Sequence, residues 1–192
     1  AEFYQRMHAE AIEGIPDGNG KLWLDIGCGP GLFTRMVSDR GYRAIGINRD
    51  PDMIQQARHL VGEGVSAPSF IAGDISTMSL PPANVVSASS LLAVLDDRAG
   101  GLSMLLELLS PGGLLLIIEA TRKMDLHSAW RMVLDGRVGS KWPALLLWSL
   151  ARQGNTVPET LYTVDREPDA VTCKPLLGGL AGVWTIRKES SS

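Results

Sequence analysis

The sequence has few of the residues that build metal centres and disulfide frameworks. It contains two cysteines, Cys28 and Cys173, and three histidines, and none of them stands in a CxxC motif or in the Cys/His spacing of a zinc site. This argues against a metal site and against disulfide bonds, and it fits a reducing compartment. Because the start also lacks the pattern of a secretory signal, we expect a cytoplasmic protein without a metal ion.

Long apolar runs and clusters of basic charge are also missing. The most apolar stretches, residues 114–118 and 144–147, are far shorter than the roughly 20 residues that a membrane-spanning helix needs. The net charge is −3 and no run of Lys and Arg stands out, so neither a membrane nor a nucleic acid is expected as a partner. With 192 residues, 45% of them hydrophobic and 20% charged, the chain suits one globular domain, residues 1–192.

Short apolar runs alternate along the chain with segments of helical periodicity. Strands are expected at residues 21–26, 43–48, 69–72, 84–89, 114–119 and 181–187, with another within 171–177. Asp50 and Pro51 are typical of a helix start, and the helix that follows is expected to bury Met53, Ile54, Ala57, Leu60 and Val61. Other helices are expected after residue 31 and at residues 2–12, 102–109, 125–134 and 143–152.

This order of strands and helices predicts the fold class. Nearly continuous apolar strands such as residues 114–119 are typical of parallel sheets covered on both faces. Strand–helix alternation with short links predicts right-handed crossovers and a doubly wound α/β fold. We therefore expect a Rossmann-like, mostly parallel sheet of seven strands, with a C-terminal antiparallel strand after a turn at Gly178-Gly179.

The most informative stretch is the glycine-rich loop of residues 24–31, with the sequence LDIGCGPG. It follows an expected strand and opens an expected helix, whose free N–H groups and partial positive charge suit an anionic ligand. Glycines there let the backbone approach a ligand closely. A tight turn without a ligand remains the alternative for this stretch taken alone.

Four ordered motifs resemble those of the class I S-adenosylmethionine-dependent methyltransferases. The first is the loop itself, and it is followed by GINRDPDMI at residues 46–54, GDI at residues 73–75 and LSPGGLLLIIE at residues 109–119. The resemblance covers residues 21–120, and residues 181–187 suit the family's last strand. It implies the family's fold and S-adenosylmethionine as the cofactor.

The resemblance also implies roles for individual residues. Gly27, Gly29 and Gly31, with Cys28 between them, would line the methionine part of the cofactor, and Asp25 would lie near its amino group. Asn48 would face the ribose hydroxyls, while Ile47 and Met53 would enclose the adenine ring. Asp74 would accept from the adenine amino group, and the backbone N–H of Ile75 would meet a ring nitrogen. Ser89 and Ser90 would face the sulfonium.

Three of these assignments also have a purely structural explanation. Met53 could be a core residue, Asp74 could cap a turn, and Ser89 and Ser90 could be ordinary residues at a strand end.

Asn48 departs from the family pattern, which has Asp or Glu at this position. An amide has one acceptor oxygen and two donor hydrogens, so it cannot accept from both ribose hydroxyls as a carboxylate can. A neutral residue followed by Arg49 would also suit the 2′-phosphate of NADP. That alternative requires glycine where the chain has Leu32, and the chain has no Tyr-x-x-x-Lys pair.

The expected chemistry is methyl transfer by in-line displacement, which depends mainly on proximity and orientation. A general base is needed only for an acceptor that must lose a proton, and His127, after the fifth strand, is the candidate catalytic residue. The fourth strand lacks the Asn/Asp-Pro-Pro-Tyr/Phe motif of enzymes that methylate amines of nucleic-acid bases. A small-molecule acceptor is therefore expected, and a catalytically silent cofactor-binding protein remains an alternative.

We expect four segments of the single domain to have different roles. Residues 1–20 would form a helical cap over the cofactor, residues 21–120 the cofactor-binding core, residues 121–160 the acceptor pocket, and residues 161–188 the C-terminal strands. Within the third segment, Arg122, Lys123 and Arg131 would bind an acidic group or face water.

Overall fold

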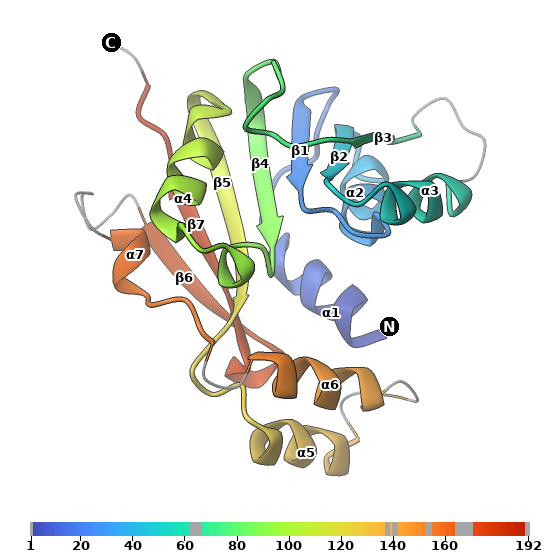
Figure 1. Cartoon of the computed structure of the whole chain (residues 1–192), viewed down its shortest axis with the longest axis vertical. Helices are drawn as coiled ribbons and strands as arrows, with labels where there is room; N and C mark the ends of the chain where they lie inside the picture. Colours follow the sequence, from blue (N-terminus) through green and yellow to red (C-terminus); the bar gives the residue numbers. More distant parts are fainter. Residues whose placement is uncertain are drawn as a thin grey trace.

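Seven strands form one sheet, and helices pack around it (Figure 1). The computed structural model describes residues 2–61, 67–136, 139, 142–152, 155–163 and 171–190. The strands are β1 (Leu22–Ile26), β2 (Arg43–Asn48), β3 (Ser69–Ala72), β4 (Ala83–Ser89), β5 (Leu109–Ala120), β6 (Val171–Leu176) and β7 (Ala181–Arg187). The helices are α1 (Glu2–Ala11), α2 (Leu32–Ser38), α3 (Pro51–His59), α4 (Arg98–Glu107), α5 (Leu126–Leu134), α6 (Trp142–Arg152) and α7 (Thr160–Thr163), with 3-10 turns η1 (Leu92–Val94) and η3 (Leu177–Gly179).

The seven strands lie in the order β3-β2-β1-β4-β5-β7-β6. Strands β1 to β5 pair in parallel, whereas β7 is antiparallel to β5 and to β6. The predicted doubly wound, mostly parallel sheet is thereby confirmed. The chain builds outward from β1 to β3 and then returns to the other side of β1 with β4, which makes the carboxyl ends of β1 and β4 a topological switch point. Ligands of open α/β sheets bind at such a crevice.

Two apolar layers cover the two faces of the sheet. Along β5, Leu115 and Ile117 belong to one layer and Leu116 and Ile118 to the other, because successive strand side chains point to opposite faces. This is why the strand is apolar at almost every position. Figure 1 shows α4 beside β5, α7 beside the outer strands β6 and β7, and α1, α5 and α6 near the carboxyl ends of β4 and β5.

Two sequence-based details differ from the structure. On α3 only Ile54 and Ala57 are buried, while Met53 and Leu60 are exposed, so the predicted buried face of five residues is too wide. Because α3 packs against β2 and β3 at the edge of the sheet, its outer side faces solvent. Strand β5 also begins at Leu109 instead of residue 114, and its pairing with β4 shifts register near this start. No described helix is long and apolar enough to cross a membrane.

Candidate active site

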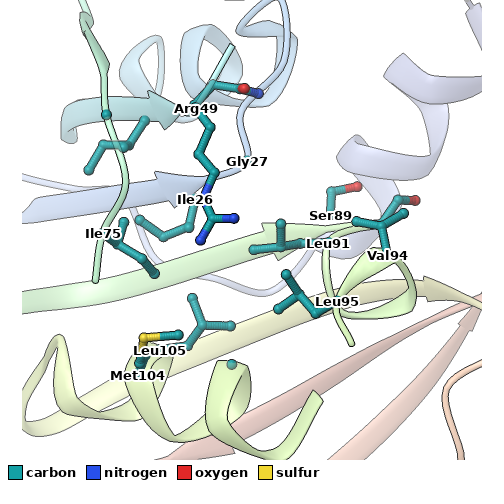
Figure 2. A pocket seen from close by; sticks show the side chains of 15 residues that line it. Ile26, Gly27, Arg49, Ile75, Ser89, Leu91, Val94, Leu95, Met104 and Leu105 are labelled. Carbon is teal, nitrogen blue, oxygen red and sulfur yellow. The ribbon is translucent and has the colours of Figure 1, made fainter. Parts of the chain in front are cut away.

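A cavity of about 360 Å³ lies at the carboxyl ends of β1, β2 and β4, at the topological switch point of the sheet. This volume is within the usual range of small-molecule sites. Figure 2 shows the cavity between these strand ends and α4. Its lining includes six residues that the sequence predicted: Gly27, Ile47, Asn48, Ile75, Ser89 and Ser90. Its opposite wall, which the sequence did not predict, consists of Leu91, Val94, Leu95, Met104 and Leu105.

The glycine loop after β1 forms one rim of this cavity. The N–H groups of Gly27 and Cys28 donate to the carbonyl of Ile47 at 2.8 and 3.1 Å, which ties the loop to the end of β2. Gly27, Gly29 and Gly31 all have positive φ, at 72°, 51° and 72°. A Cβ on Gly29 would meet nothing within 4 Å, whereas a Cβ on Gly31 would overlap the ring of Phe70. The conformation thus favours glycine at both positions, but only Gly29 opens onto free space.

Asp25 lies beneath the loop and does not line the cavity. Its side chain is buried, and its two oxygens accept from Ser87 Oγ at 2.9 Å and from Thr34 Oγ1 at 2.7 Å. Ser87 Oγ in turn accepts from Trp23 Nε1 at 2.8 Å. Burial raises the pKa of Asp25 to about 6, although both hydroxyl donors act in the opposite direction. The carboxyl group thereby joins β1, β4 and the first turn of α2.

Asn48, Arg49 and Asp74 form the polar rim beside β2 and β3. Asn48 Oδ1 accepts from the N–H of Asp50 at 2.9 Å, so the amide presents its NH₂ group to other partners. Arg49 extends into the cavity (Figure 2) and pairs with Asp74 at 2.8 Å. The N–H and hydroxyl of Ser76 also donate to Asp74, and these bonds, more than Arg49, lower the pKa of that carboxyl group.

The far end of the cavity lies where α1 and α6 meet the end of β4. His8 Nε2 lies 3.2 Å from Ser89 Oγ, and Arg152 donates to the carbonyl of Ser90 at 3.0 Å. Burial lowers the pKa of His8 to about 4, so this ring is neutral near pH 7. Ser90 has a φ of +56°, an uncommon conformation for a residue with a side chain. Strain of this kind occurs often at functional sites.

Glu119, at the end of β5, supports the wall opposite the loop. It is 1% exposed, and its Oε1 accepts from the N–H of Ala93 in η1 at 3.3 Å. Burial raises the pKa of Glu119 to about 7, against the opposing effects of the Ala93 hydrogen bond and of Arg152. Glu119 is not among the site residues predicted from the sequence. In the sequence, Glu119 is recognisable only as a single acidic residue near the end of an otherwise apolar strand.

Several predicted site residues lie elsewhere. His127 is exposed on α5, and Met53 is exposed on α3, and neither belongs to the lining of the cavity. Cys28 is half-buried in the loop, and burial raises the pKa of its thiol to about 12, so it remains protonated. Arg122, Lys123 and Arg131 line a separate hollow between β5, α5 and η3.

The sequence also resembles known proteins. A family model described as a methyltransferase domain matches residues 24–117. A malonyl-[acyl-carrier protein] O-methyltransferase of Serratia marcescens is 33% identical over 137 residues, which cover 69% of this chain and 52% of the relative. A trans-aconitate 2-methyltransferase of Methylobacterium radiotolerans is 31% identical over 115 residues, which cover 58% of this chain and 43% of the relative. The chain thus spans about half the length of these relatives.

Solved structures agree on the fold. The plantazolicin methyltransferase BpumL, determined in complex with SAH, superposes with a TM-score of 0.65 at 16% identity, covering 98% of this chain and 84% of that one. The N-methyltransferase NodS of Bradyrhizobium japonicum gives a TM-score of 0.60 at 18% identity, covering 97% and 87%. The chain belongs to the class I S-adenosylmethionine-dependent methyltransferase family. The cofactor prediction is confirmed, since this family uses S-adenosylmethionine.

The described residues fit that cofactor of the class I methyltransferases. The free space beside Gly29 lets a ligand approach the loop, and the apolar wall of Leu91 and Leu105 suits a ring system. The NH₂ group of Asn48 and the Ser89-Ser90 segment supply polar groups on two sides of the cavity.

Substituting Gly29 and Gly31 separates ligand binding from packing. Gly29→Ala is expected to lower the free energy of unfolding by about 1–2 kcal/mol, the cost of positive φ, and to weaken S-adenosylhomocysteine binding at least tenfold. Gly31→Ala is expected to cost clearly more stability, because its Cβ also overlaps Phe70. Urea denaturation and calorimetric titration measure the two effects. Undiminished binding by the Gly29 variant would contradict the placement of the ligand beside this glycine.

Glu119→Gln is expected to make stability less dependent on pH. The pKa of Glu119 is raised in the folded state, so the folded protein holds the proton more tightly and stability falls as pH rises from about 4.5 through 7. The free energy of unfolding of the variant should therefore rise by roughly 2–3 kcal/mol relative to that of the wild type between pH 5 and pH 8.

Subtracting the wild-type value from the variant value at each pH removes the opposite contribution of His8, because both proteins contain it. The lowered pKa of His8 adds stability as pH rises from about 4 to 6.5. Urea denaturation at both pH values measures this, with Glu107→Gln on the exposed side of α4 as control. A constant difference between variant and wild type would contradict it.

Proposed function

We propose that this chain transfers the methyl group of S-adenosylmethionine to a small-molecule acceptor. The observation that carries the proposal is the cavity at the switch point, which joins the glycine loop, Asn48, Ile75 and the Ser89-Ser90 segment. One relative supports it by its name, since trans-aconitate is a small molecule, whereas the other acts on a malonyl group carried by a protein. The sulfonium supplies a reactive methyl group and a neutral leaving group, so the protein needs mainly to align donor and acceptor.

In this proposal the chain's residues bind and orient the cofactor. The Gly27–Gly31 loop holds the methionine part, with Cys28 and the buried Asp25 supporting the loop. Ile47 packs on the adenine, the N–H of Ile75 and the carboxylate of Asp74 meet its polar edge, and Ser89 and Ser90 border the sulfonium. Met53 and His127 are given no role, because both side chains are exposed and outside the cavity lining.

The four segments of the domain take the expected parts in this proposal. Residues 21–120 hold the cofactor, and residues 161–188 complete the sheet. Residues 1–20 cover the site, in keeping with the contact between His8 and Ser89. Residues 121–160 border the acceptor, in keeping with the contact between Arg152 and Ser90.

Calorimetric titration tests the proposal directly. S-adenosylmethionine and S-adenosylhomocysteine should each bind with one site per chain, while NADP⁺ and NAD⁺ should not bind. Formation of S-adenosylhomocysteine with an acceptor then distinguishes an enzyme from a catalytically silent binding protein. Preference for NADP⁺ would overturn the proposal and favour the alternative that Asn48 and Arg49 suggest.

Asn48→Asp is expected to tighten S-adenosylhomocysteine binding about fivefold. The carboxylate would keep the hydrogen bond from Asp50 N–H and add a charged acceptor for the ribose hydroxyls, a difference of about 1 kcal/mol. Asn19→Asp, in the exposed turn before β1, adds the same charge at a distance and serves as control. Equal affinities of wild type and the Asn48 variant would mean that this side chain does not bind the ribose.

A further inference from the structure

Four buried polar atoms without hydrogen-bond partners belong to residues at or beside the carboxyl ends of β4 and β5: His8 Nδ1, Ser90 Oγ, Glu119 Oε2 and Arg152 Nε. Within the described part of the chain, Trp148 Nε1, on α6 about one turn before Arg152, also lacks a partner. An unpaired buried polar group destabilises the folded state, and native proteins have few of them. By contrast, every polar side chain of the Asp25 network beneath the loop is paired. The unpaired set therefore marks a region that is completed by something other than the chain.

Three elements bring several of these groups to one place. His8 from α1 contacts Ser89, and Arg152 from α6 donates to the carbonyl of Ser90. The N–H of Ser90 donates to the carbonyl of Ile118 at 2.8 Å, which places the strained serine beside the β5 end that bears Glu119. Ser89 and Ser90 also line the proposed cofactor cavity. The cluster thus adjoins the position proposed for the sulfonium.

The cluster contains more hydrogen-bond donors than acceptors. The Arg152 guanidinium and the Trp148 indole can only donate, and the Ser90 hydroxyl can also donate. Arg152 is 9% exposed, and a buried guanidinium requires an anion or several acceptors. Among the residues that the structure describes, no carboxylate lies within 4 Å of it. Glu119 lowers the cost of its charge only in part, because burial keeps the pKa of that acid near 7.

We infer that Arg152 binds a carboxylate of the acceptor and that an oxygen of this carboxylate receives the methyl group. The inference rests on the proposed function. A lone pair of the carboxylate oxygen forms the new O–CH₃ bond while the S–CH₃ bond breaks and its electron pair stays on sulfur. The products are a neutral methyl ester and S-adenosylhomocysteine, and no proton moves.

The surroundings of the reacting position agree with an acceptor that arrives already ionised. His8, the histidine beside Ser89, is a weak base because burial lowers its pKa to about 4. A hydroxyl or ammonium acceptor would need a stronger base in this position. The rings of Tyr4 and Trp148, with centroids 5.6 Å apart, pack together and close the gap between α1 and α6 beside this position.

The test compares acids with neutral molecules of the same skeleton. Acetate, succinate, benzoate and octanoate are incubated with the protein and S-adenosylmethionine, beside the corresponding amides and alcohols. Mass spectrometry should detect methyl esters of acids and no methylated amide or alcohol. In calorimetry, the protein saturated with S-adenosylhomocysteine should bind at least one of the acids more tightly than its amide.

Substitution of Arg152 tests the assignment of the residue. Arg152→Met is expected to reduce kcat/KM for the methylated acid about 100-fold, mainly through KM, because a charged hydrogen-bond partner is lost. Arg152→Lys, which retains the charge without the paired donors, should recover part of the activity. Arg187→Met at the exposed end of β7 is the control and should leave kcat/KM unchanged. In all variants the dissociation constant of S-adenosylhomocysteine should stay within twofold of the wild type.

The possible results separate this inference from the proposed function. Loss of cofactor binding in the wild type would overturn both. Cofactor binding with methylation of amides or alcohols instead of acids, or with no acid bound in preference to its amide, would overturn the carboxylate acceptor alone. These readouts use the wild-type protein, so they hold even if the Met variant does not fold. Ester formation that is unchanged in a folded Arg152→Met variant would overturn the role of Arg152.

Discussion

The structure around the site depends on one buried carboxyl group. Asp25 joins β1 to β4 through Ser87 and to α2 through Thr34, and it lies directly below the glycine loop. Its charge is expensive to bury, and hydrogen bonds from two hydroxyls offset part of that cost. Because β1 and β4 are the strands that flank the switch point, this group holds both rims of the cavity in register. A side chain that the family pattern associates with the cofactor therefore acts here first on the protein itself.

The glycines fulfil two different requirements imposed by this arrangement. Gly31 begins α2 with a positive φ and must leave room for the ring of Phe70, so packing against β3 is sufficient to explain it. Gly29 has the same constraint on φ but nothing near it. Its positive φ alone favours glycine there, as at Gly20 before β1, and in the proposed complex the open space beside Gly29 admits the cofactor. The loop motif is thus partly a folding motif and partly a binding motif.

Periodicity was sufficient to predict the sheet and its mostly parallel pairing, and the resemblance to the methyltransferases implied six of the fifteen residues that line the cavity. Those features depend on residues close in sequence, such as the apolar run of β5 and the loop after β1. The ion pair of Arg49 with Asp74 and the contacts of His8 and Arg152 with the Ser89-Ser90 segment join residues far apart along the chain, and one sequence carries no signal for them. Met53 was wrongly expected to be buried, because helical spacing does not reveal that α3 lies at the sheet edge.

The two ends of the cavity satisfy their buried polar groups differently. Beneath the loop, each donor of the Asp25 network has an acceptor, and the arrangement is complete without a ligand. At the end of β4, Ser90 is strained and Arg152 retains an unpaired N–H in a buried position. Unpaired buried groups do not stabilise this second region, and replacing a buried charge by apolar residues is often neutral or stabilising. In the proposed complex, a carboxylate of the acceptor supplies oxygens to the unpaired donors of Ser90 and Arg152, so this end of the cavity serves recognition at a cost in stability.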